Sequence, residues 1–176
     1  MIEPTRRYAE IVYSRTVERF VQRLFLREPV VRNLCIVSPF ISAMTGSRYS
    51  LALLRAKIER ERIPTYVVTR EPIEPYQFEA AQVLEKCPWI EVRYNPSVHA
   101  KVYVVQSAPE SESFALFGSG NLTSSSIERN VELGMMIYNV GPGRDLVREL
   151  HYWAAVRLRQ LAESKLVQPI RLKRRL

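Results

Sequence analysis

Residues 98–105 read Val-His-Ala-Lys-Val-Tyr-Val-Val, and this alternation of polar and β-branched residues predicts a strand. Side chains two residues apart on a strand point to the same face, so His99 and Lys101 are expected side by side at about 7 Å, while the neighbouring valines face the other way. An ammonium group next to a neutral imidazole suits a phosphate, because the ammonium neutralises nonbridging oxygens and the imidazole can attack phosphorus or transfer a proton. Such pairs also occur on solvated strand faces, so the pair alone does not decide the function.

The next strand along the chain is expected to end in residues 117–123, Phe-Gly-Ser-Gly-Asn-Leu-Thr. Glycines allow the backbone to come close to an anion, and the Ser119 hydroxyl and the Asn121 amide could donate hydrogen bonds to that anion. An ordinary glycine turn is the alternative interpretation of this motif.

Glu132 lies eleven residues beyond Asn121, within residues 130–137, Asn-Val-Glu-Leu-Gly-Met-Met-Ile. Strand spacing places Glu132 and Asn130 on one face among apolar neighbours. A carboxylate that enters a buried strand needs a polar partner. A histidine is available for this role, and the carboxylate would orient its ring and hold it in one tautomer.

The rest of the chain alternates strand and helix patterns, which predicts an α/β fold with a mixed, mainly parallel sheet flanked by helices. Its first half follows a strand–helix–strand order typical of parallel crossovers, whereas a polar linker joins two of the later strands. Helices are expected over residues 5–27, 49–61, 75–86 and 144–166, and strands over 33–37, 65–69, 89–93, 98–105, 113–117 and 131–138.

The length of 176 residues and the ordinary share of hydrophobic residues, 47%, favour a single domain, expected over 1–167, with a basic tail at 168–176. The formal net charge is +8, and four of these charges come from Arg171, Lys173, Arg174 and Arg175. A basic surface attracts polyanions such as nucleic acid or anionic lipid. The tail could also bind a protein partner.

The two cysteines, Cys35 and Cys87, show no CxxC or Cys/His spacing, so we expect reduced thiols, no metal and no cofactor. The N-terminus has no apolar signal core, and no run approaches the ~18 apolar residues that span a bilayer. These features predict a cytoplasmic protein without a membrane partner.

Taken together, the motifs resemble the phospholipase D superfamily, whose signature is His-x-Lys followed by Gly-Ser-x-Asn. The resemblance is to the small single-motif nucleases of that superfamily in particular, which carry a Glu downstream of the Asn. Residues 36–40 are similar to the family's early strand, so the resemblance covers most of the chain and implies the mixed α/β fold of the family. The matching residues occur in the family's order: His99, Lys101, Ser119, Asn121 and Glu132.

The sequence departs from the family pattern in two places. The family's usual Asp, five residues after Lys101, is Gln106 here, and residues 107–113 look like an insertion. That Asp is generally structural in the family, so its absence concerns local packing more than catalysis. The change also leaves open a catalytically inactive relative.

The resemblance implies a metal-independent, two-step phosphoryl transfer, in which one motif's histidine forms a phosphohistidine and another motif's histidine protonates the leaving oxygen. One chain carries one motif, so we expect a two-fold homodimer with a shared site. The second histidine, His151, lies in the C-terminal helical segment, where a packed or solvated role is expected. Arg70, at a strand end, and Arg48, in a loop, could bind a phosphate of the substrate, with surface ion pairing as the alternative for each.

The expected function is that of a phosphodiesterase which cleaves nucleic acid, with DNA favoured, because the chain is basic and has no large apolar stripe for a lipid surface. One alternative is a phospholipid hydrolase or phosphatidyl transferase that uses the same site, although a domain of this length leaves little sequence for an acyl-chain pocket. The other is a catalytically inactive nucleic-acid-binding subunit, against which the presence of all five site residues argues.

Overall fold

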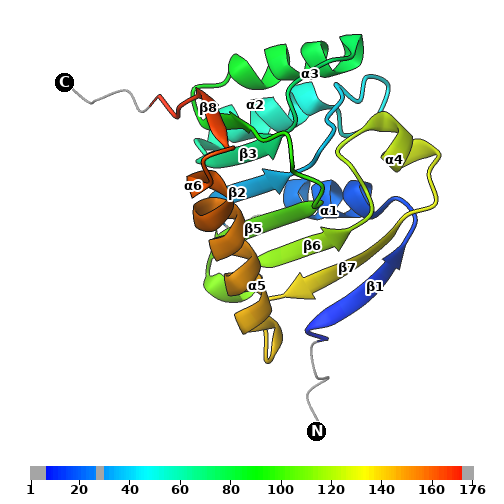
Figure 1. Ribbon diagram of the computed structural model, residues 1–176. Coiled ribbons are helices and arrows are strands. Elements are labelled where there is room, and N and C mark those ends of the chain that lie inside the picture. Colours follow the sequence, from blue (N-terminus) through cyan, green and yellow to red (C-terminus); the bar gives the residue numbers. More distant parts are fainter. Residues whose placement is uncertain (1–6, 27–29, 172–176) are drawn as a thin grey trace, which may run out of the picture.

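The computed structural model describes residues 7–26 and 30–171. Within these residues, eight strands form one sheet in the order β1-β7-β6-β5-β2-β3-β4-β8 (Figure 1). The β2–β3 and β3–β4 pairs are parallel, and the other five neighbouring pairs are antiparallel. The strands are β1 (Ala9–Tyr13), β2 (Val30–Val37), β3 (Thr65–Thr69), β4 (Ile90–Tyr94), β5 (Val102–Ala108), β6 (Phe114–Gly118), β7 (Leu133–Tyr138) and β8 (Lys165–Gln168).

Helices cover both faces of the sheet (Figure 1). One face packs against α1 (Thr16–Phe25), α2 (Leu51–Glu61), α3 (Pro75–Glu85) and the short α4 (Ser124–Glu128). The other face packs against α5 (Gly143–Tyr152), the π-helical turn η2 (Trp153–Arg157) and α6 (Leu158–Gln160). A 3₁₀ turn, η1 (Glu110–Glu112), lies between β5 and β6.

The alternation of buried residues along β5 shows why the sheet needs helices on both sides. Tyr103 and Val105 belong to the core beneath α1 to α3, whereas Val102 and Val104 belong to the core beneath α5. The first core is the larger, and in it the Phe20 ring of α1 packs 5.4 Å from the Tyr103 ring, measured between centroids. β5 is therefore buried on both faces, and the segment with His99 and Lys101 leads directly into this buried strand.

The expected helix over residues 5–27 was wrong in its first part. Residues 9–13 form β1, which pairs with β7 at the edge of the sheet. Val12 is buried there while Ile11 and Tyr13 are exposed, which is the two-residue period of a strand. The chain reverses at Ser14, whose φ is 56°, and α1 then begins at Thr16; residues 5, 6 and 27 of the expected helix lie outside the described part.

The mixed α/β sheet is confirmed, but the expectation that it is mainly parallel was wrong. β5 and β6 are joined by residues 109–113, which are too few for a crossover, whereas residues 119–132 between β6 and β7 carry α4 and still return the chain antiparallel to β6. The strand expected over 98–105 begins only at Val102. Its partner β2 ends at Val37, and the proline that follows at position 39 has no backbone N–H to donate to a continued ladder.

The C-terminal helix expected over 144–166 is interrupted earlier than predicted. It passes through the π-helical turn and ends at Gln160, and β8 then adds an antiparallel strand beside β4. Gln168, the first residue of the predicted basic tail, lies in this strand and donates hydrogen bonds to the carbonyls of Cys87 and Ile90, both at 2.9 Å. Residues 172–176 of that tail lie outside the described residues.

The helices of the described residues include none that is both long enough and apolar enough to cross a bilayer.

Candidate active site

The segments that carry His99, Lys101, Ser119, Asn121 and Glu132 adjoin strand ends at one edge of the sheet, the edge at the right in Figure 1. β2, β3 and β6 end at this edge, and β5 and β7 begin there, because β5 and β7 run antiparallel to their neighbours. Val37, Val102 and Phe117 lie side by side on three strands, and Gly118 pairs with Gly134. Residues far apart in the sequence therefore meet at these strand ends, which we call the site edge.

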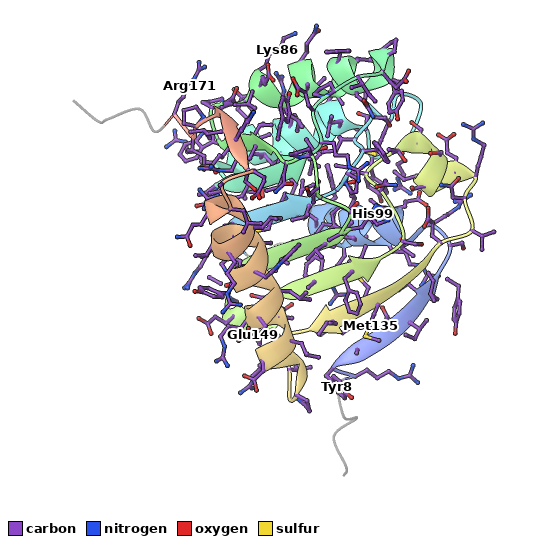
Figure 2. All side chains as sticks on the ribbon, in the orientation of Figure 1. Tyr8, Lys86, His99, Met135, Glu149 and Arg171 are labelled. Atoms are coloured by element: carbon purple, nitrogen blue, oxygen red, sulfur yellow. The ribbon has the colours of Figure 1, made fainter. Side chains whose placement is uncertain are left out.

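His99 and Lys101 occupy the irregular segment that leads into β5. The His99 side chain is exposed at the site edge (Figure 2), and Lys101 Nζ donates a hydrogen bond to the His99 carbonyl at 2.9 Å. The Lys101 carbonyl accepts from the Gly118 backbone N–H at 3.2 Å. The two side chains expected to hold a phosphate thus stand on one short segment that is tied to the Gly-Ser motif.

Glu132 is the buried acid of the site, with 6% of its surface exposed. Its carboxylate accepts hydrogen bonds from the Ser119 hydroxyl and from Asn130 Nδ2, the latter at 3.2 Å. The Ser119 hydroxyl also accepts from the Leu133 backbone N–H at 3.1 Å. The partners of this carboxylate are therefore a serine and an asparagine, where a histidine was expected; an orienting contact between Glu132 and His99 stays a prediction.

The two glycines that flank Ser119 are required by packing. A Cβ at Gly120 would lie 2.6 Å from Thr16 Oγ1 on the first turn of α1, and a Cβ at Gly118 would collide with the backbone of Leu133. These positions let β6 and its following loop lie directly against α1 and β7. The close approach places the Ser119 hydroxyl within hydrogen-bond distance of the Glu132 carboxylate. The glycines are thus required by packing, whereas the sequence suggested that they give an anion access to the backbone.

Ser38 is a residue that sequence reasoning missed as part of the site. It is fully buried directly after β2, and its hydroxyl donates to the Phe40 carbonyl at 2.7 Å and accepts from the Leu122 backbone N–H at 3.0 Å. The same hydroxyl lies 3.5 Å from Asn121 Oδ1. Ser38 therefore fastens the Asn121 loop to the end of β2, and its only sequence signal is a small hydroxyl residue between a buried strand and a proline.

Tyr103 is a second missed residue, because its place in an apolar strand suggests only packing. Its buried phenol donates a hydrogen bond to the Gly120 carbonyl at 2.9 Å. Burial raises the pKa of Tyr103 and outweighs the hydrogen bond with Ser38, which lowers it, while the charge of Glu132 raises it further. The phenol therefore stays protonated and supports the Gly-Ser loop from below as a donor.

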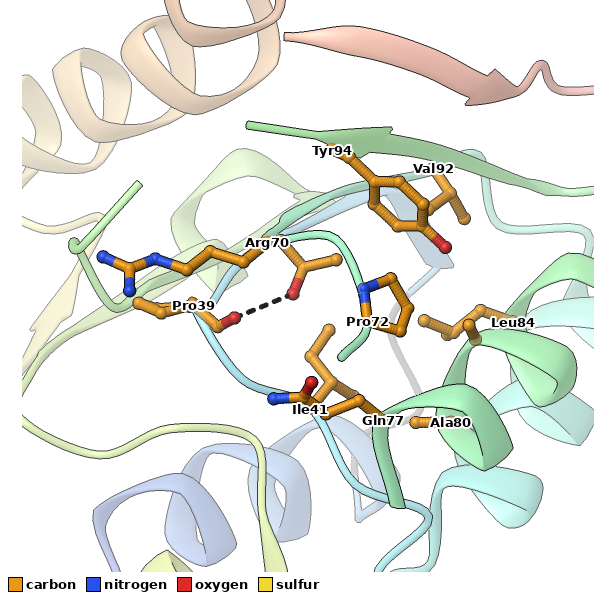
Figure 3. Close-up of a pocket in the computed structure, with 11 residues that line it drawn as sticks. Pro39, Ile41, Arg70, Pro72, Gln77, Ala80, Leu84, Val92 and Tyr94 are labelled. Carbon is orange, nitrogen blue, oxygen red and sulfur yellow. Dashed lines mark hydrogen bonds between the residues drawn. The ribbon is translucent and has the colours of Figure 1, made fainter. Parts of the chain in front are cut away.

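Arg70 is brought to the site edge by the end of β3. Its Nε donates to the Val98 carbonyl at 2.9 Å, and its guanidinium lies 5.5 Å from the centroid of the Phe40 ring. The Arg70 backbone borders a small cavity of about 20 Å³ between the end of β2 and α3, and its side chain points away from this cavity (Figure 3). This hydrogen bond holds the Arg70 guanidinium next to Val98, the residue that precedes His99.

Arg48, the other residue expected to bind substrate, is exposed in the loop between β2 and α2. Its guanidinium lies 5.7 Å from the ring centroid of the adjacent Tyr49. Within the described part of the chain, no hydrogen bond or ion pair joins Arg48 to the five expected catalytic residues. Its role in substrate binding stays a prediction.

His151 lies in α5, away from the site edge. Its Nε2 is 2.9 Å from Asn33 Oδ1, and burial lowers its pKa. Asn33 precedes Val37 by four residues, which places it about 13 Å back along β2. The packed role expected for His151 agrees with this position.

Titratable groups that could bind a metal are the next feature of the described residues. Within the described ranges, no group of three or more His, Cys, Asp or Glu side chains could hold a metal ion. Cys35 and Cys87 are free and buried, and burial raises the pKa of Cys35 to about 12.

The fold is similar to that of several solved structures. Nuc from Salmonella typhimurium, a phospholipase D family member, superimposes with a TM-score of 0.68 at 15% identity, over 92% of this chain and 98% of that chain. NucT from Helicobacter pylori gives a TM-score of 0.57 at 10% identity, over 85% of this chain and 96% of that chain. TrmBL2, an archaeal chromatin protein described by its mode of DNA binding, gives 0.50 at 12% identity, over 86% and 54%.

Among curated proteins, none matches the sequence. A family model does match: the one described as "Cardiolipin synthase, PLD-like domain" covers residues 45–155. That range is more than half of the chain, and it includes all five expected catalytic residues. Because this family model covers more than half of the chain, the chain belongs to the family of phospholipase D-like domains.

Proposed function

We propose that this protein is a phosphodiesterase that cleaves nucleic acid at a site shared by two copies of the chain. The observation that carries the proposal is the site edge itself, where the His99–Lys101 segment, the Ser119–Asn121 loop and Glu132 meet. Cation, hydroxyl, amide and imidazole groups together can bind a phosphodiester and attack its phosphorus.

The proposed reaction begins when a neutral His99 imidazole attacks the phosphorus. An N–P bond forms, the P–O bond to the leaving group breaks, and the leaving oxygen takes a proton from a second imidazole. Water then attacks the phosphohistidine and gives its proton to that second imidazole, while the N–P bond breaks. Lys101 and Asn121 stabilise the nonbridging oxygens, and Glu132 holds Ser119 in place.

The need for a second imidazole supports the homodimer. The sequence contains two histidines, and His151 is held against Asn33 about 13 Å back along β2 from the site edge. A second copy of His99, brought by two-fold symmetry, is the simplest source of the general acid.

Nucleic acid is the substrate we favour because the net charge of +8 attracts a polyanion. The DNA-binding description of TrmBL2, whose fold is similar, is consistent with this choice. A phospholipid substrate is the alternative, since the matching family model carries the name of a cardiolipin synthase. A catalytically inactive nucleic-acid-binding subunit is the second alternative. Activity measurements distinguish the nuclease, the phospholipid enzyme and the inactive subunit.

The test is incubation of the purified protein with labelled DNA, labelled RNA and phosphatidylcholine vesicles in EDTA. We expect cleavage of nucleic acid that survives the chelator, because the nucleophile is an imidazole. His99→Ala should lower turnover about 1,000-fold or more, and Lys101→Ala should weaken both binding and rate. His151→Asn is the matched control and should retain turnover.

Mixing His99→Ala subunits with wild-type subunits tests the shared site, because a dimer with one His99 cannot complete the cycle. Strict dependence on Mg²⁺ or Mn²⁺, or full activity of His99→Ala, would contradict the proposal. Turnover of phosphatidylcholine alone would establish the lipid alternative, and binding of DNA without cleavage would indicate the inactive subunit.

A further inference from the structure

A cavity of about 330 Å³ lies beside the site edge, between the start of α3 and the short helix α4. In Figure 1, α4 lies at the right, next to the strand ends, and α3 lies above it. Thr123 lines the cavity and follows Asn121 by two residues, so the two backbones lie within about 7 Å of each other. The lining residues are Ser42, Tyr76, Thr123, Ser124, Ser125 and Arg129. We call this cavity the Tyr76 pocket.

Tyr76 presents an aromatic ring to this pocket. It is the second residue of α3, and 43% of its surface is exposed. Its phenol oxygen accepts a hydrogen bond from Nε2 of the buried Gln77 at 3.2 Å. Gln77 Oε1 in turn accepts from the backbone N–H groups of Ile73 and Glu74, at 2.8 and 3.0 Å. The ring is thus fastened to the first turn of α3, and a ligand that stacks on it orders little that is not already held.

The opposite wall of the pocket carries hydroxyl groups and a cation. The buried Ser42 hydroxyl accepts from the Ser124 backbone N–H at 3.0 Å and lies 3.4 Å from Ser124 Oγ, which joins the loop after β2 to the start of α4. Arg129 follows the last residue of α4 and is exposed. No ion pair involves Arg129 in the part of the chain that the structure describes, so its guanidinium can pair with an anionic ligand.

The lining of the Tyr76 pocket fits a nucleotide better than an acyl chain. Apart from Tyr76, the lining side chains are four hydroxyl residues and one arginine, without an Asp or Glu. Two larger cavities beside α1, of about 430 and 500 Å³, each include a carboxylate, Glu112 in one and Glu10 in the other, which would repel a phosphate. Bases stack on aromatic rings, hydroxyls bond to base edges, and arginine pairs with phosphate.

We propose that the Tyr76 pocket holds the nucleotide next to the phosphodiester that is cleaved, an inference that rests on the proposed function. The base stacks on the Tyr76 ring, and Arg129 pairs with the phosphate of that nucleotide. Asn121, which binds the scissile phosphate in the proposed reaction, stands on the same loop as Thr123, so one strand can occupy both places. Every base has a π face, so the pocket strengthens binding without selecting a sequence.

The test compares two probes in the His99→Ala background, where cleavage is not expected. One probe is a fluorescent single-stranded octathymidylate, and the other is a deoxyribose phosphate chain of the same length without bases. Tyr76→Ala should raise the dissociation constant of the octathymidylate about 10-fold, measured by fluorescence anisotropy, and leave that of the base-free chain unchanged. Arg129→Ala should weaken both probes and lower the salt dependence of their binding, because it pairs with phosphate.

Phe78→Ala is the matched control for the ring, because Phe78 lies on the same helix and is 51% exposed but does not line the pocket. Arg144→Ala is the control for the charge, since Arg144 is exposed on α5, which packs on the other face of the sheet. Both should bind the octathymidylate as the His99→Ala parent does. Tyr76→Phe should retain binding, and Tyr76→Leu should lose it; circular dichroism verifies that each variant is folded.

Turnover gives the second readout. In the chain with His99, Tyr76→Ala should raise KM for a labelled oligonucleotide about 10-fold with little change in kcat, because stacking is the same in the ground state and the transition state.

Equal affinity of Tyr76→Ala and its parent for the octathymidylate would overturn the pocket, and so would equal losses for the two probes. Loss of binding to phosphatidylglycerol vesicles in place of the octathymidylate would assign the pocket to a lipid headgroup and overturn the proposal as well. A chain that binds the octathymidylate through Tyr76 but cleaves no phosphodiester would support the pocket and refute the proposed function. Cleavage of nucleic acid with an unchanged KM in Tyr76→Ala would do the reverse.

Discussion

Replacement of Ser38 by alanine tests whether the end of β2 organises the site. Ser38→Ala removes one hydroxyl that donates to the Phe40 carbonyl at 2.7 Å and accepts from the Leu122 N–H at 3.0 Å. Leu122 is 1% exposed, so its N–H loses its hydroxyl partner where water cannot readily replace it. A buried donor left unsatisfied costs about 1–3 kcal/mol.

We therefore expect Ser38→Ala to lower the free energy of unfolding by about 2 kcal/mol, which corresponds to a decrease in Tm of about 4–8 °C for a chain of this size. Turnover should also fall, because the loop that carries Asn121 is no longer fastened to β2. The measurements are thermal and urea unfolding followed by circular dichroism, together with kcat and KM on a short labelled oligonucleotide.

Ser125→Ala is the matched control for this experiment. Its hydroxyl lies 3.1 Å from the Thr123 hydroxyl, and the position is partly exposed at the start of α4, so its loss should cost less than about 0.5 kcal/mol. If the two variants are equally stable, or if Ser38→Ala retains both stability and turnover, then Ser38 does not hold the loop and the reasoning is wrong.

Gly120→Ala should destabilise the protein by about 1–3 kcal/mol and reduce turnover, since the new Cβ would lie 2.6 Å from Thr16 Oγ1; adding Thr16→Ala should restore part of the loss in urea unfolding, and no restoration would contradict the clash. Burial alone would raise the pKa of Glu91, but hydrogen bonds from two arginines, Arg159 foremost, bring it below its ordinary value of 4.5. The stability that Glu91 contributes is therefore present above about pH 4.5 and lost as the pH falls through its folded pKa, so Glu91→Gln should flatten the acid limb of unfolding free energy against pH. Burial lowers the pKa of His151, so its contribution is present above about pH 6.5 and lost on acidification; His151→Asn should reduce the stability difference between about pH 7 and pH 5, and an unchanged difference would count against its burial.

The order of the motif residues along the chain predicts the family from the sequence alone. His99, Lys101, Ser119, Asn121 and Glu132 follow a spacing that resembles the phospholipase D superfamily, and the family model covers all of them. Alternating apolar runs also predicted the α/β class, because periodicity depends only on which face of an element is buried. The motifs and the apolar periodicity each depend on a few neighbouring residues, so they can be recognised without knowledge of the tertiary structure.

The N-terminal segment shows where local pattern is insufficient. Residues 9–13 and α1 together look like one helical stripe, yet β7 offers an open edge for pairing and residues 9–13 become a strand. The antiparallel direction of β5, β6 and β7 was likewise decided by the neighbours with which these strands pair in the sheet.

Only the tertiary structure assigned Ser38 and Tyr103 to the site. Ser38 meets the Asn121 loop across 83 residues of sequence, and Tyr103 meets Gly120 beneath it. The partners of Glu132 were decided in the same way, because the strand register, and not the sequence spacing, places the Ser119 hydroxyl against its carboxylate. A hydrogen bond between distant segments depends on how whole elements pack, and no local pattern encodes that distance.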